Sequence, residues 1–133
     1  MLSPRLKDRH PSVVLAAHNG FRFDIPILIS ECWRNCIPLG FATEWFFVDT
    51  LDIVKAVGLG TIGGCGKLQC LTRRMRIDTT MLAAHRALDD CYALRSVVEC
   101  AAQMHGVTLW NLVREFTVSM DMAATCTNLS VLL

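Results

Sequence analysis

Residues 12–26 read Ser-Val-Val-Leu-Ala-Ala-His-Asn-Gly-Phe-Arg-Phe-Asp-Ile-Pro, and this stretch decides the fold. Residues 12–17 are mostly apolar or β-branched, which is typical of a buried parallel strand. Asp24 and Pro26 suit the cap and the first turn of a helix, and apolar residues then recur at helical spacing. The stretch therefore predicts a strand, a turn and a helix.

Strand and helix patterns continue downstream and predict an α/β fold. The expected elements are strands at 12–17 and 44–48 and helices at about 24–35, 50–57, 67–75, 86–105 and 109–118. Two strands separated by a helix predict at least one right-handed β-α-β crossover. Asp49 or Thr50 is expected to cap the second helix and Thr108 the last one. A glycine-rich segment at 58–66 lacks the Gly-Lys-Ser/Thr of a phosphate-binding loop and is interpreted as a connector.

Length and composition predict one domain with an ample core. The chain has 133 residues, of which 53% are hydrophobic and 19% charged. We expect a leader at 1–11, a domain at 12–118 and a tail at 119–133, with Trp33, Trp45 and Trp110 in the core. Lys plus Arg number 13 against 12 for Asp plus Glu, so binding of a polyanion requires a local patch or bound metal.

No segment has the pattern of a membrane span or a signal peptide. Clean apolar runs such as residues 13–17 reach only strand length, whereas a membrane helix needs about 20 residues. The basic leader is followed by an apolar run too short for a signal peptide. These features predict an intracellular protein, nuclear or cytoplasmic, with no membrane partner.

Seven cysteines, an odd number without a signal peptide, favour free thiols. Cys32 and Cys36 lie at helical spacing on one apolar face. Neither this pair nor Cys65 and Cys70 has the two-residue gap of a zinc knuckle. Buried thiols are therefore favoured over zinc ligands.

A second run, His85-Arg86-Ala87-Leu88-Asp89-Asp90, places a histidine before the long helix and carboxylates in its first turns. A histidine in the loop can swing over Asp90, and Asp24 follows a strand, where α/β proteins place active sites. Carboxylates hold Mg²⁺ or Mn²⁺, and a histidine with a pKa of about 6.5 can take a proton from water. The two runs predict a metal-dependent site that cuts phosphodiesters.

Several of these residues also have simpler interpretations. Asp24 is either a helix cap or a metal ligand. Asp89 complements the helix dipole, although a shift of one residue would exchange it with Asp90. The arginines of the short basic helix form a solvated face or contact phosphates. These are Arg73, Arg74 and Arg76.

The two runs resemble motifs of the DnaQ-like 3′–5′ exonucleases of the DEDDh group, above all the three-prime repair exonucleases. The second family motif, His-Asn-x-x-x-Phe-Asp, is matched by residues 18–24, and the third, His-x-x-x-x-Asp, by residues 85–90. Between them, Phe-Phe-Val-Asp-Thr-Leu at 46–51 resembles the strand that follows the second motif. The resemblance covers about residues 12–105 and implies an RNase H-like fold.

The resemblance also implies roles for individual residues. Asp24 and Asp90 would be ligands of Mg²⁺ or Mn²⁺, and His85 would be the general base. Asn19, Arg22 and Phe23 would line the groove near the 3′ end. The partner would be a nucleic acid with a 3′ end, single-stranded DNA or RNA, and the products nucleoside 5′-monophosphates released by two-metal hydrolysis.

The first family motif, Asp-x-Glu on the opening strand, has no counterpart in the 133 residues. We therefore expect an N-terminally truncated fold in which the strand at 12–17 lacks its central neighbour and has an apolar edge prone to pairing. Weak nuclease activity and poor solubility are expected of the isolated chain. The alternative is a non-catalytic nucleic-acid- or protein-binding module that retains the fold.

Overall fold

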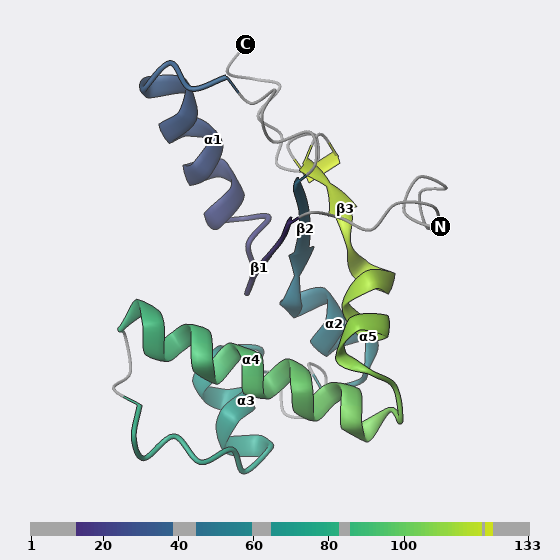
Figure 1. Ribbon diagram of the computed structural model, residues 1–133. Helices are drawn as coiled ribbons and strands as arrows, with labels where there is room; N and C mark the ends of the chain where they lie inside the picture. The colour runs from purple at the N-terminus through teal and green to yellow at the C-terminus, as the bar shows by residue number, and fades with distance from the viewer. Residues whose placement is uncertain (1–12, 39–44, 60–64, 83–85, 121, 124–133) are drawn as a thin grey trace. The chain divides into compact units, whose positions relative to one another are not determined.

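The computed structural model describes residues 13–38, 45–59, 65–82, 86–120, 122 and 123. The described residues form three strands and five helices, which confirms the α/β class. In chain order the elements are β1 (Val13–Ala17), α1 (Asp24–Arg34), β2 (Trp45–Asp49), α2 (Thr50–Ala56), α3 (Leu68–Arg74), α4 (Ala87–Met104), α5 (Leu109–Phe116) and β3 (Val118–Ser119) (Figure 1). They divide into two compact units. One runs up to Asp49 and resumes at Arg114, and the other is Thr50–Val113.

The three strands form one sheet in the order β1-β2-β3. β1 and β2 are parallel, with Val13 paired with Trp45 and Ala17 with Asp49, and α1 connects them (Figure 1). The predicted strand-helix-strand unit is therefore confirmed. β3 pairs antiparallel with β2. The sequence pattern does not show β3, because two residues are too few for a period.

The core of the first unit lies between α1 and the sheet. Its buried members are Ile25, Ile29, Phe47, Met120 and Ala123. The ring of Phe47 meets the ring of Phe21 edge to face, with 5.1 Å between the ring centroids, a favourable aromatic geometry. Trp45 packs partly buried against this core. The prediction of Trp33 in the core is wrong: it lies about 80° around the helix from Ile25 and is 61% exposed.

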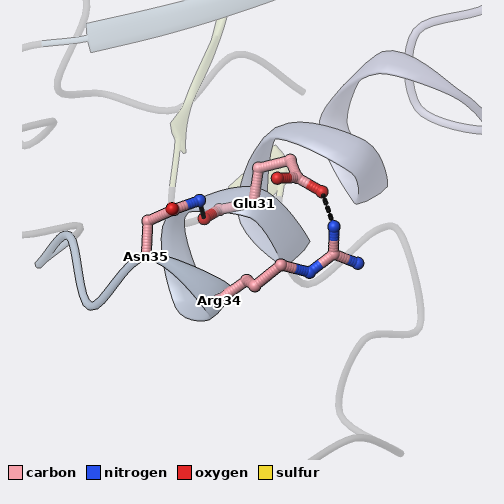
Figure 2. A network of polar contacts seen from close by, with 3 residues as sticks. All are labelled: Glu31, Arg34 and Asn35. Carbon is pink, nitrogen blue, oxygen red and sulfur yellow. Dashed lines mark hydrogen bonds and ion pairs between the residues drawn. The ribbon is translucent and has the colours of Figure 1, made fainter.

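The C-terminal end of α1 carries a small polar network (Figure 2). The Arg34 guanidinium donates to the Glu31 carboxylate at 2.6 Å, and the Asn35 side-chain amide donates to the Glu31 carbonyl oxygen at 2.8 Å. The second bond satisfies a carbonyl that the helix end leaves without a partner. Both side chains of the ion pair are exposed, so this pair contributes little to stability.

In the second unit α4 packs against both α2 and α3 (Figure 1). The buried residues of α4 are Ala93, Val97, Val98, Ala101 and Ala102. Leu88 and Cys91 do not belong to this buried stripe, since both are exposed. They lie about 140° and 160° around the helix from Ala93, and therefore face away from the buried stripe.

α5 begins as the sequence predicts, because the Thr108 hydroxyl accepts the backbone N–H of Asn111 at 3.2 Å and thereby caps the helix. The helix ends at Phe116, and Leu112 is its buried residue. Trp110 is 39% exposed, so its predicted place in the core is wrong.

The cysteines differ from the prediction of buried free thiols. Cys65 and Cys70 form a disulfide. Cys36 and Cys91 are exposed, whereas Cys32 is buried as expected. Cys36 lies beyond the end of α1, so it does not share the apolar face of that helix.

α4 is the longest described helix, with 18 residues. Arg95 donates to the Glu99 carboxylate at 2.7 Å along its exposed face, and this hydrogen bond raises the pKa of Arg95.

None of the described helices combines the length and apolar character needed to cross a bilayer.

Candidate functional site

The turn between β1 and α1 and the first residue of α1 carry four of the predicted site residues. The turn follows the carboxyl end of β1, where α/β proteins place their sites. Asn19 adopts a left-handed backbone conformation with φ of 61°, which asparagine tolerates better than most residues. The Asn19 carbonyl accepts the N–H of Arg22 at 3.2 Å, and the Gly20 carbonyl accepts the N–H of Ile25 at 2.9 Å. The backbone of the turn is thus fixed by its own hydrogen bonds.

Asp49 holds this turn from the end of the neighbouring strand. Its carboxylate accepts the backbone N–H of Asn19 at 2.8 Å and that of Phe21 at 3.2 Å. Asp49 is 4% exposed, so these bonds lie where water competes poorly. The sequence predicts only a helix cap at Asp49, because the partners lie 28 and 30 residues away. This long-range role was missed, and the position of Asp49 at a strand end is the signal that could have found it.

The turn passes close to the ring of Phe47 and the side chain of Ala17 at Gly20, and this approach requires glycine. A Cβ atom at this position would lie 2.8 Å from the Cβ of Ala17 and would collide with the ring of Phe47. The aromatic ring is fully buried and cannot swing aside. The close approach of turn and ring therefore needs glycine.

The outer side of the turn exposes a cation, an aromatic ring and a carboxylate. Arg22, Phe23 and Asp24 are all exposed, and Phe23 keeps 59% of its surface accessible. Asp24 is the first residue of α1, whereas Phe23 occupies the cap position without a capping side-chain bond. The prediction of Asp24 as the cap is therefore wrong. Its charge still lies at the positive end of the helix dipole.

The second unit contains a pocket of about 500 Å³ between α3, α4 and residues 76–82, a size typical of ligand sites. Its polar lining consists of Gln69, Thr72, Arg73, Arg76, Thr79, Asp89 and Asp90. Asp90 lies in the first turn of α4 and is half-buried. Among the described residues, Arg73 and Arg76 form no ion pair with a carboxylate. The pocket lining therefore combines two guanidinium groups, Arg73 and Arg76, with two carboxylates, Asp89 and Asp90.

Arg76 reaches the pocket from a strained backbone. Its φ is 53°, and it occupies the left-handed position of a Schellman motif in which Arg76 N–H bonds Arg73 O and Ile77 N–H bonds Thr72 O. α2 and α4 end in the same motif with Gly58 and Gly106 at this position. Arg76 and Cys36 are the two non-glycine residues that the described chain places in this position of the motif.

We expect Arg76→Gly to raise the free energy of unfolding by about 0.5–1 kcal/mol, because glycine relieves the left-handed strain. Urea denaturation measures this change. Cys36→Gly is the matched control, since Cys36 holds the same position after α1 with φ of 54°. A loss of stability in both variants would contradict the assigned strain.

A carboxylate holds the turn at residues 78–80, beside the pocket. Asp78 accepts the backbone N–H of Thr80 at 2.9 Å and its hydroxyl at 2.7 Å, and these two bonds lower the pKa of Asp78. Because the pKa is lower in the folded state, the stabilisation is present above the ordinary pKa and is lost as pH falls through the lowered value. Asp78 is exposed, so the effect is local to the turn beside Thr79.

The described residues supply oxygen donors of the kind that Mg²⁺ and Mn²⁺ prefer, at Asp24 in one unit and at Asp89 and Asp90 in the other. Within the described ranges there is no group of three His, Cys, Asp or Glu side chains that could hold a metal ion. His85, the predicted general base, lies outside the described residues. The described residues alone do not complete a two-ion centre.

The predicted site residues that the structure describes fall into two groups, one in each unit. Asn19, Arg22, Phe23 and Asp24 share one turn, and Asp90 shares one pocket with Arg73 and Arg76. No known protein family, curated protein or solved structure matches the chain.

Proposed function

We propose that this chain is a 3′–5′ exonuclease domain of the DnaQ-like DEDDh type, with an RNase H-like fold, that binds the 3′ end of single-stranded DNA or RNA inside the cell. The observation that carries the proposal is the α3–α4 pocket, in which Asp90 accompanies Arg73 and Arg76. Guanidinium groups bind phosphate oxygens in bidentate fashion, and a carboxylate beside them suits the metal ion that accompanies phosphates. Arg73 and Arg76 hold the phosphate in this proposal.

The turn after β1 supports the same function. An exposed aromatic ring next to an exposed cation is the combination with which proteins bind unpaired bases and their backbone. Phe23 and Arg22 provide it on a turn that Asp49 fixes. In the proposal Phe23 stacks on a base and Arg22 contacts a phosphate. Asn19 shapes the turn that carries these two residues.

The resemblance assigns metal binding to Asp24 and Asp90 and proton abstraction to His85. When bound, Mg²⁺ or Mn²⁺ would supply activated water and stabilise the leaving oxygen. Two carboxylates bind such ions weakly. We therefore expect slow release of nucleoside 5′-monophosphates by these 133 residues alone.

A non-catalytic nucleic-acid-binding module is the second candidate. It is favoured by the sequence, in which no Asp-x-Glu occurs anywhere. Such a module would use the same pocket and turn for binding, without hydrolysis.

Asp90→Asn separates the two candidates. With millimolar Mn²⁺ and an oligonucleotide labelled near its 5′ end, we expect the wild-type chain to shorten the 3′ end slowly. The variant should lose this activity and keep its binding, because the amide cannot replace the charged ligand. Gel analysis of the products and fluorescence anisotropy measure the two effects. Binding without any shortening by the wild type supports the non-catalytic module. A wild type that neither binds nor cuts overturns both.

A further inference from the structure

The Cys65–Cys70 disulfide joins the segment before α3 to the first turn of that helix. α3 has seven residues, and its cap residue Lys67 makes no side-chain capping bond. Helices of this length are marginal unless other contacts fix them. The disulfide is therefore well placed to hold the first turn of α3.

The turn enclosed by the disulfide forms part of the pocket wall. Leu68 and Gln69 lie between the two cysteines and line the pocket. The Gln69 carbonyl also accepts the hydroxyl of Thr72 at 3.1 Å, and Thr72 is a buried pocket residue. Unwinding of the first turn would therefore change the pocket directly.

Hydrogen bonds of one α3 side chain also hold the segment beside the disulfide. The Arg74 guanidinium donates to the carbonyl oxygens of Leu59 and Cys65, and its bond to Cys65 is long, at 3.4 Å. A hydrogen bond of this length is weak. Once the disulfide is reduced, this bond is a poor substitute for the covalent link between Cys65 and α3.

We propose that the Cys65–Cys70 disulfide is a redox switch of the α3–α4 pocket, and this rests on the proposed binding of nucleic acid there. A dithiol reductant attacks one cysteine sulfur and forms a mixed disulfide, and its second thiol then displaces that sulfur. The reductant ends as its own disulfide, and two electrons and two protons pass to Cys65 and Cys70. Both cysteines are only half-buried, which gives a dithiol access. The bridged chain binds the ligand, and the dithiol chain binds it more weakly.

Fluorescence anisotropy with a labelled single-stranded oligonucleotide tests the switch on the full chain before reduction, after dithiothreitol, and after reoxidation. We expect reduction to weaken binding by about fivefold or more, within the usual range for coupled sites, and reoxidation to restore it. Cys70→Ser should bind weakly in both conditions. Cys91→Ser, which changes an exposed free cysteine, should respond to reductant as the wild type does.

Amide hydrogen exchange distinguishes failure of the switch from failure of the proposed function. Exchange at Cys70 and Leu71, whose N–H groups bond the Lys67 carbonyl, should accelerate by about tenfold on reduction whether or not nucleic acid binds. Equal binding in both redox states overturns the switch and leaves the function standing. Absence of binding in both states overturns the proposed function, and unchanged exchange then overturns the switch as well.

Discussion

Phe47→Ala is expected to lower the free energy of unfolding by about 3–5 kcal/mol, the usual cost of removing a buried aromatic side chain. Phe47 is 1% exposed and is the largest fully buried side chain of the described chain. Its removal deprives Phe21 of its ring partner and leaves a cavity beneath Gly20. Urea denaturation followed by circular dichroism measures the change.

Phe23→Ala is the matched control, because it deletes the same side chain from a position that is 59% exposed. We expect its effect on stability to stay within about 0.5 kcal/mol. Equal effects of the two variants would contradict the assigned core.

Asp49→Ala is expected to cost about 2–3 kcal/mol of stability, because the backbone N–H groups of Asn19 and Phe21 lose their shared acceptor in a partly buried turn. The variant should also weaken nucleic-acid binding, since Arg22 and Phe23 lie on that turn. Amide exchange of Asn19 and Phe21, measured by NMR, should accelerate, whereas Val98 in the second unit should keep its protection.

Asp49→Asn provides the graded control. Its amide retains one oxygen acceptor, so one of the two bonds can persist and an intermediate loss of stability is expected. If Asp49→Ala leaves the exchange of Asn19 and Phe21 unchanged, the carboxylate does not hold the turn.

The binding residues of the pocket give a further comparison. Arg76→Gly should be more stable than the wild type yet bind the oligonucleotide less tightly, with a salt dependence reduced by about one phosphate contact. Cys36→Gly should gain similar stability and keep full affinity. If both variants gain stability and only Arg76→Gly loses affinity, the strained Arg76 side chain serves binding.

Local sequence signals determined the elements that have a clear period. The two parallel strands, α1 and α4 lie within one or two residues of their predicted bounds. Their apolar repeats and β-branched runs can be recognised from residues that are close together in the sequence. The hydroxyl cap at Thr108 and the glycine at the end of α4 were predictable for the same reason. Asp24 and Asp90 lie in the first turns of α1 and α4 as predicted, although Asp24 is not the cap.

Only the tertiary structure decided what depends on distant parts of the chain. Trp33 and Leu88 are apolar, yet they are exposed, because the packed neighbours of each helix cover only one face. The bonds from Asn19 and Phe21 to Asp49 and the pairing of strand β3 with β2 depend on residues that lie far apart in the sequence, so no local pattern encodes them. The sequence by itself therefore determined the run from β1 through the turn to α1. Folding decided which side chain holds that turn, because strand pairing brings a carboxylate 30 residues away within 2.8 Å of its backbone.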